Sequence, residues 1–275
     1  MEKYNFGNAP NGKSTYRLPT VAVVGGGAAG VAAAAECALI GFKVLLFDEK
    51  DRLGGRYAGS HPATPPRGFG FRKNNLRHTK VRNPNAEEAC QHIAAALTDG
   101  DYTVYLNTRI TAIAFDNSDS QWNVKDDEGQ TYTADVVIVA NGTGTIENVT
   151  TGKGYDIDLN DTHHHLGVEP IGVPNILVID GPEPPQPRFF ARPLDLVEAK
   201  ANHCQDYVRQ LEVIGPAALF INKSMWTATP NTWRSFIASL GAFNQGNHEF
   251  IFPEDKGKQP KKKQTSEHNR TAPAK

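Results

Sequence analysis

Apolar residues along the chain gather into continuous runs and into periodic stretches, and each pattern predicts a different element. Continuous apolar runs, typical of strands buried on both faces of a sheet, occupy residues 20–24, 43–48, 134–140 and 175–180. Between the first two runs, the Ala-rich stretch 31–40 predicts a helix that ends at Gly41. A strand, a helix and a second strand in this order predict a βαβ unit, and therefore a parallel sheet.

The middle and the C-terminal part of the chain follow other patterns. Short apolar runs between residues 102 and 133 are separated by turn residues, and they predict a small antiparallel meander. Helical periodicity predicts a helix over 86–97 and a helical C-terminal part over 194–240. Residues 56–85 are rich in Gly, Pro, Arg and Asn, and predict a long loop of the kind that commonly carries function. The expected organisation is a loose arm, one domain and a disordered tail, at residues 1–19, 20–253 and 254–275.

Composition and charge narrow the function classes. The 275 residues include 29 Lys and Arg against 30 Asp and Glu, so the net charge of −1 creates no overall field toward nucleic acid or an anionic membrane. The tail carries seven Lys or Arg against three Asp or Glu and almost nothing apolar, which is typical of a solvated segment. The three cysteines are far apart and the chain starts with polar residues. We therefore expect a cytoplasmic protein with no metal site, no nucleic-acid partner and no membrane association.

The first βαβ unit carries a glycine pattern that suits dinucleotide binding. Residues 25–30 read Gly-Gly-Gly-Ala-Ala-Gly and satisfy G-x-G-x-x-G between a strand and a helix, and Asp48 closes the next strand. Gly25 permits a tight turn, Gly27 lets the backbone approach a pyrophosphate, and Gly30 lets the helix pack closely on the strand. The helix N-terminus offers N–H groups to phosphates, and the Asp48 carboxylate can accept hydrogen bonds from a ribose.

The segment around Asp48 resembles a known family. Residues 47–57, FDEKDRLGGRY, resemble the second-strand segment of flavin monooxygenases and Baeyer–Villiger monooxygenases. In that family an acid holds the FAD ribose and a Gly-Gly turn passes the pyrophosphate. Asp48, Gly54 and Gly55 fall at the matching positions, with Asp in place of the family's usual Glu.

Two later stretches extend the resemblance. RITAIAF and QWNV, followed by ADVVIVANG, look like the family's meander and the strand after it, although Asn141 replaces the usual Thr. VPNILVIDGPEPP looks like the strand that closes the family's flavin site. The resemblance implies an α/β fold: a Rossmann-type FAD domain of the two-dinucleotide-binding kind, with an inserted antiparallel meander and a helical C-terminal segment. The cofactor-binding residues implied by the glycine pattern and the resemblance are Gly25, Gly27, Ala28, Ala29, Gly30, Asp48, Glu49, Gly54, Gly55, Arg56, Ile110, Ala140, Gly142, Asp180 and Gly181.

One part of the family pattern is missing between these stretches. The family carries a second G-x-G-x-x-G domain there, which binds NADPH. Only about thirty residues separate Gly142 from Pro174, whereas a nucleotide-binding domain needs on the order of 100. We therefore expect an FAD-binding enzyme of specialised metabolism that acts on a hydrophobic small molecule without its own NADPH site.

Several hypotheses for this function stay open. The substrate reduces the flavin in an oxidase or dehydrogenase that passes electrons to O2, or a separate reductase reduces it in a monooxygenase-like enzyme. Alternatively, the scaffold catalyses a non-redox cyclisation or isomerisation. A further hypothesis is a non-catalytic flavin-binding partner subunit, and a homo-oligomer is compatible with each.

Three residues are candidates for catalysis. Arg188 and Arg192 flank two phenylalanines in the Pro-rich loop after the last apolar strand, where they can hold a carboxylate or an enolate. His164 lies in the connection where the NADPH domain is missing, and an imidazole there can act as a general acid or base.

Overall fold

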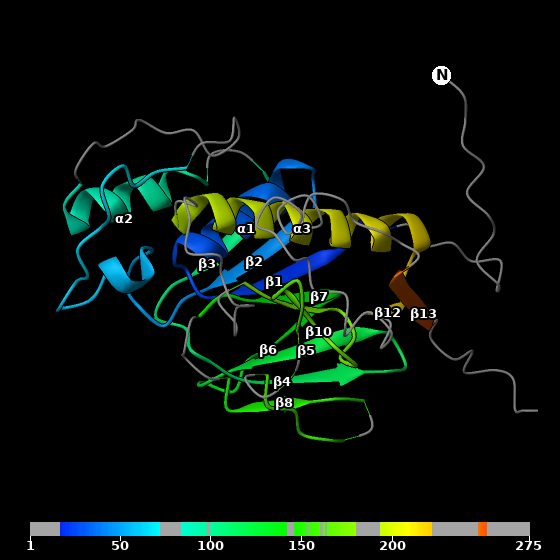
Figure 1. Cartoon of the computed structure of the whole chain (residues 1–275). Coiled ribbons are helices and arrows are strands. Elements are labelled where there is room, and N and C mark those ends of the chain that lie inside the picture. The colour runs from blue at the N-terminus through cyan, green and yellow to red at the C-terminus, as the bar shows by residue number, and fades with distance from the viewer. Residues whose placement is uncertain are drawn as a thin grey trace, which may run out of the picture.

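The computed structural model forms three layers, with helices above a parallel sheet and a second sheet beneath it (Figure 1). The residues that it describes are 17–71, 84–97, 100–141, 146–152, 154–159, 162, 164–179, 193–221 and 247–251. The parallel sheet separates two buried apolar clusters, one on each of its faces. The predicted α/β, Rossmann-type fold class is confirmed.

The central layer is a five-stranded sheet with the strand order β11-β7-β1-β2-β3. Its strands are β1 (Thr20–Val24), β2 (Lys43–Phe47), β3 (Tyr102–Tyr105), β7 (Val136–Val139) and β11 (Ile176–Val178). All neighbouring pairs are parallel, so the carboxyl ends of the strands meet at one edge. The continuous apolar runs predicted four of these strands, β1, β2, β7 and β11, because both faces of the sheet are covered.

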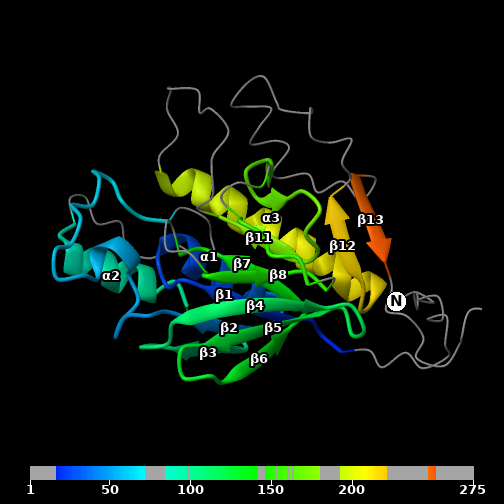
Figure 2. The same ribbon diagram turned by 90° about the horizontal axis from the view of Figure 1, so that it is seen from below.

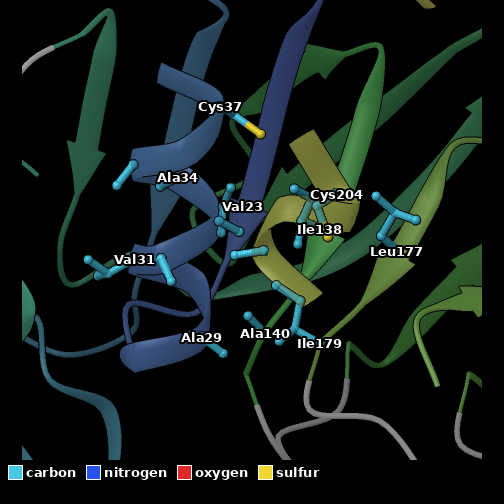
Figure 3. Close-up of a cluster of buried hydrophobic side chains, with 14 of the residues drawn as sticks. Val23, Ala29, Val31, Ala34, Cys37, Ile138, Ala140, Leu177, Ile179 and Cys204 are labelled. Atoms are coloured by element: carbon cyan, nitrogen blue, oxygen red, sulfur yellow. The ribbon is translucent and has the colours of Figure 1, made fainter. Parts of the chain in front are cut away.

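The helices α1 (Ala28–Leu39), α2 (Ala86–Ala94) and α3 (Pro193–Ile214) cover one face of the sheet. Six buried alanines in α1 let its backbone lie close to both the sheet and α3. Figure 3 shows Cys37 of α1 and Cys204 of α3 in the same buried cluster. A capping box fixes the start of α2, since Asn85 and Glu88 each bond the other's backbone N–H.

The second sheet packs on the opposite face, as Figure 2 shows from below. Its order is β6-β5-β4-β8, from β4 (Ile110–Asp116), β5 (Gln121–Asp126), β6 (Thr131–Ala134) and β8 (Asn148–Thr150). Trp122 of β5 is fully buried, and its indole N–H donates to the carbonyl oxygens of Pro174 and Asn175, both at 3.1 Å. This bond ties the second sheet to the start of β11.

The predicted meander over 102–133 was wrong at its first strand. Residues 102–105 form β3, which pairs in parallel with β2 and closes the edge of the central sheet. A four-residue run does not indicate which strand it will pair with. Residues 102–105 form hydrogen bonds with the edge of β2 and not with the meander. The antiparallel meander consists of β4, β5 and β6.

In the predicted helical part over 194–240, residues 194–214 do lie in α3, but the prediction was wrong at 218–221, and residues 222–240 lie outside the described residues. Gly215, with φ of +90°, and Pro216 end α3, and the apolar run after them forms β12 (Ala218–Ile221). This strand pairs antiparallel with β13 (His248–Ile251). A second short hairpin joins β9 (His164–His165) to β10 (Glu169–Pro170). Most of the predicted arm and the whole predicted tail lie outside the described residues.

Among the helices in the described part of the chain, none combines the length and the apolar character that crossing a bilayer requires.

Candidate functional site

The glycine turn lies between β1 and α1, at the carboxyl edge of the central sheet. Gly25 has φ of +112°, and its N–H donates to the Phe47 carbonyl at 2.8 Å. A Cβ at Gly25 would lie 2.5 Å from the Ala140 carbonyl oxygen, and a Cβ at Gly30 would overlap the Gly25 carbonyl. Both glycines are therefore required by the packing of the protein on itself.

Gly27 differs from these two glycines. It is the N-cap of α1 with φ of −75°, which any residue can adopt. A Cβ there would meet only the Gly55 Cα, at 3.6 Å, and no side chain caps the helix. The first N–H groups of α1 have no partner within the helix, so they and the space before them are available to an anion.

Asp48 follows β2 and closes the site on one side. It is buried, with 7% of its surface exposed, and its carboxylate accepts hydrogen bonds from the N–H groups of Gly26 and Lys50. Burial raises the pKa of Asp48, and these two bonds oppose the rise only in part. The carboxylate is thus fixed against the glycine turn and presents its remaining lone pairs at the sheet edge.

The Gly54–Gly55 turn packs directly against the glycine turn. The Gly54 N–H donates to the Gly26 carbonyl at 2.9 Å, and a Cβ at Gly55 would lie only 2.8 Å from the Gly27 Cα. The Lys50 ammonium donates to the Gly55 carbonyl at 2.7 Å and holds this turn in place. We call the assembly of Gly25, Gly26, Gly27, Gly30, Asp48, Gly54 and Gly55 the glycine edge.

The structure brings some of the other predicted cofactor residues to this edge. Ala140 is buried at the end of β7, against Gly25, and Ala28 and Ala29 form the first turn of α1. Ile110 is buried at the start of β4, within the apolar cluster between the two sheets. Glu49, after β2, and Arg56, in a short 3-10 helix (Gly55–Tyr57), are both exposed. Gly142, Asp180, Gly181, Arg188 and Arg192 lie outside the described residues.

Two further polar side chains bear on the sequence predictions. The Asn141 side-chain oxygen, directly after Ala140, is buried and has no hydrogen-bond partner within the described part. His164 lies in β9, where its Nε2–H donates to the Leu159 carbonyl at 2.8 Å. This bond gives His164 a structural contact within its own segment.

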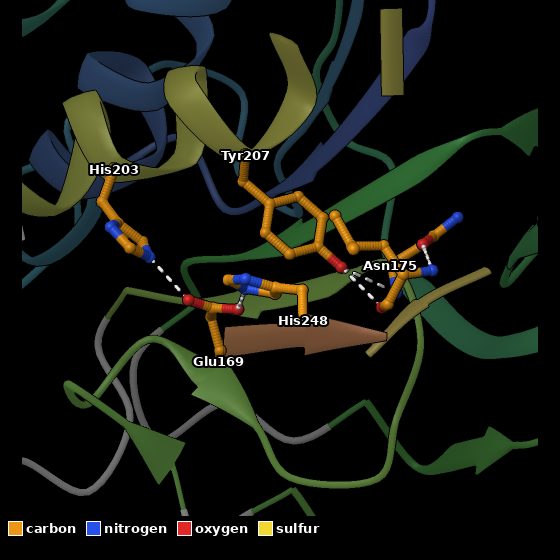
Figure 4. Close-up of polar contacts among 6 residues, drawn as sticks. Glu169, Asn175, His203, Tyr207 and His248 are labelled. Carbon is orange, nitrogen blue, oxygen red and sulfur yellow. Dashed lines mark hydrogen bonds and ion pairs between the residues drawn. The ribbon is translucent and has the colours of Figure 1, made fainter. Parts of the chain in front are cut away.

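A buried polar cluster beside β11 was missed by the sequence analysis (Figure 4). Glu169 of β10 accepts hydrogen bonds from His203 of α3 at 2.7 Å and from His248 of β13 at 2.6 Å. Burial alone would raise the pKa of Glu169, but the bonds and the charge of the two imidazoles outweigh it and lower the pKa to about 2. Beside them, the Tyr207 hydroxyl donates to the Leu219 carbonyl and accepts from the Asn175 N–H.

The Glu169 cluster is our name for Glu169, Asn175, His203, Tyr207 and His248. Its members come from four segments that are distant in the sequence, so no local motif reveals them. One signal was present in α3, where Lys200, His203 and Tyr207 are spaced i, i+3 and i+7 on the stripe that the apolar periodicity buries. Within the described residues, no group of three His, Cys, Asp or Glu side chains is arranged to hold a metal ion.

Comparison with known proteins gives one family match and several distant relatives. A sequence model of the family described as pyridine nucleotide-disulphide oxidoreductase matches residues 19–168. Ferredoxin–NADP reductases of Paraburkholderia phytofirmans and Paraburkholderia xenovorans are 24% and 23% identical over 148 residues, which is 54% of this chain. The matched stretch spans 40% and 39% of those two proteins.

Solved structures with a similar fold include several monooxygenases. Cyclohexanone monooxygenase from Rhodococcus sp. Phi1 bound to NADP+ is 16% identical with a TM-score of 0.38, over 62% of this chain and 32% of that one. The S-allyl-L-cysteine S-oxygenase of Allium sativum is 19% identical with a TM-score of 0.35, over 46% of this chain and 37% of that one.

Proposed function

Because the chain belongs to the pyridine nucleotide-disulphide oxidoreductase family, we propose that it is an FAD-dependent oxidoreductase that holds its cofactor along the glycine edge. The observation that carries the proposal is the difference between its glycines. Gly25 and Gly30 are required by internal packing, whereas Gly27 is not, because a Cβ there meets no clashing protein atom. A glycine that the fold does not need is explained by a ligand whose backbone contact it permits.

The residues of the glycine edge suit the parts of FAD. The N-terminus of α1 and the open Gly27 position would hold the pyrophosphate, and the Asp48 carboxylate would accept hydrogen bonds from the adenosine ribose. The Gly54–Gly55 turn, which carries no side chain, would pass the pyrophosphate on its other side. When bound, the flavin would supply electron transfer, and the chain would supply orientation and charge.

We propose that the electrons come from outside the chain, and the connection between β7 and β11 supports this proposal. Within residues 140–175 the described parts form β8, which extends the second sheet, and the short β9–β10 hairpin. This connection supports a flavin that is reduced by an oxidisable substrate or by a separate reductase. We further propose that the substrate is a hydrophobic small molecule of specialised metabolism and that O2 accepts the electrons.

Flavin content tests the proposal. Full-length purified protein should carry FAD, with the absorbance near 450 nm that is typical of oxidised flavin. Gly27→Val should abolish FAD binding while the protein stays folded, because a Cβ there makes only an ordinary contact with the Gly55 Cα, at 3.6 Å. Gly59→Val is the matched control, since that loop glycine also has room for a Cβ and lies outside the glycine edge. Equal flavin content in wild type and Gly27→Val would refute the assignment of the site.

Anaerobic titration then separates the hypotheses for the chemistry. Bleaching of the flavin by an oxidisable substrate, followed by recovery in air, supports an oxidase. Bleaching only with an added reductase supports an externally reduced enzyme. Turnover of a substrate with no bleaching and no O2 uptake would instead support a non-redox cyclisation or isomerisation.

A further inference from the structure

Lys200 is a buried cation at the carboxyl edge of the central sheet. Only 1% of its surface is exposed, although it lies on a helix at the outside of the sheet. Its ammonium donates to the carbonyl oxygen of Ile179 at 2.8 Å. Ile179 directly follows β11, and its N–H donates to the Val139 carbonyl at the end of β7. The ammonium is therefore held at the same edge as the glycine turn, two strands further along.

The strand order predicts which part of a dinucleotide would lie near this ammonium. Asp48, the ribose acid, follows β2, and the glycine turn that faces the pyrophosphate follows β1. The order β2-β1-β7-β11 then places the other half of the molecule over the ends of β7 and β11. Figure 3 shows Ala29 of α1, Ala140 after β7 and Ile179 after β11 at this common end of the sheet. That other half is the redox-active one.

We propose that Lys200 sets the reduction potential of the bound flavin by placing a fixed positive charge beside its redox-active half. The inference rests on the proposed FAD site. Reduction would bring two electrons to the ring from the substrate or the separate reductase. A cation nearby stabilises the added electron density, and burial limits the screening of this interaction by water.

Two substitutions of Lys200 test the role of its charge. Replacing Lys200 by Met removes one unit of positive charge while keeping a side chain of similar length and an apolar stem. Lys200→Met leaves the Ile179 carbonyl without this donor, so we expect it to lower the stability of the fold. Lys200→Gln, which keeps a donor for the Ile179 carbonyl, is the second neutral variant.

The experiment is a redox titration of the full-length protein with its bound FAD, against a reference dye. In Lys200→Met and Lys200→Gln, the ratio of reduced to oxidised flavin at one fixed ambient potential should fall about tenfold. For a two-electron couple this corresponds to a potential about 30 mV more negative. The matched control is Lys43→Met, because Lys43 is an exposed lysine at the amino end of β2, at the opposite edge of the sheet. Its potential should equal that of wild type.

Each outcome bears on one of the two proposals. Wild-type protein that binds no FAD refutes the proposed function, and the inference with it. Protein that binds FAD with the same potential in wild type and in both Lys200 variants overturns the inference alone. If the variants bind FAD more weakly at an unchanged potential, Lys200 acts on the pyrophosphate and the placement beside the ring is wrong.

Discussion

The glycine edge and the Glu169 cluster lie beside the same sheet, yet they are built in opposite ways. The glycine edge consists mainly of backbone groups from residues 25–55, with one carboxylate and positions where side chains are absent. The Glu169 cluster consists of long polar side chains, and its bond from His248 to Glu169 joins residues 79 positions apart. The first has backbone N–H groups at the start of α1 that no side chain caps, whereas in the second a carboxylate and two imidazoles bond one another. A polar region whose hydrogen bonds are all made within the protein is expected to serve stability. One with unused donors is expected to serve binding.

The largest expected effect comes from breaking the cluster at its centre. Glu169→Gln removes the buried charge that both imidazoles bond, and should lower the free energy of unfolding by about 3–5 kcal/mol. Urea unfolding measures this loss. The control is Glu147→Gln, which breaks an exposed ion pair with Arg109 and should cost at most about 1 kcal/mol. Equal losses in the two variants would show that the cluster is no more than a surface pair.

Lowering the pH should also destabilise the protein through Glu169. The pKa of Glu169 is about 2 in the folded protein, below the ordinary value of 4.5, so its ionised form stabilises the fold. This contribution is complete above about pH 4.5 and is lost as the pH falls through 4.5 toward 2, because the unfolded chain binds the proton first. The measurement is urea unfolding between pH 6 and pH 3. Glu169→Gln should show a shallower dependence, and a slope equal to that of wild type would contradict the assignment.

Substitutions at Gly27 and Gly30 of the glycine edge should have intermediate effects on stability and flavin content. Gly30→Ala forces a Cβ onto the Gly25 carbonyl, so the helix must shift, at a cost of about 1–3 kcal/mol. The variant should lose both stability and flavin. Gly27→Val should lose flavin alone, and thermal unfolding beside the flavin spectrum separates the two. If Gly30→Ala is as stable as wild type, then Gly30, like Gly27, is needed only for ligand binding.

The smallest effect is expected at the rim of the Glu169 cluster. Tyr207→Phe removes the hydroxyl that donates to the Leu219 carbonyl at 2.8 Å. That carbonyl also accepts from the Asn175 N–H, so no group is left without a partner. The loss should be about 0.5–1.5 kcal/mol by urea unfolding, with flavin content unchanged. A loss as large as that of Glu169→Gln would make the tyrosine part of the charged core of the cluster.

The two regions also differ in how far the sequence predicted them. The strand, glycine turn, helix and acid of residues 20–48 lie within one local unit, so their spacing alone predicted their arrangement. The same holds for the second-sheet strands β4, β5 and β6, which are consecutive hairpins. Prediction failed for β3, because its ladder with β2 is not encoded in its own four residues.

The Glu169 cluster shows the same limit among side chains. A Glu beside a Pro in a short connection gives no sign that an imidazole from a helix and another from a distant strand will bond it. The sequence of α3 did contain one indication of the cluster, because the polar residues Lys200 and His203 fall on the buried stripe of the helix. A charged residue at such a position indicates that acceptors come from outside the helix, although it does not identify them.

The path of the chain between the two sheets has a consequence for fragments of the protein. It leaves the second sheet at β6, adds β7 to the central sheet, and returns to the second sheet as β8. Neither sheet is therefore made from one continuous stretch of chain, and a cut between them would leave each piece without a strand that its core needs. The meander cannot act as a detachable module, so the two layers gain and lose their structure in a single cooperative transition.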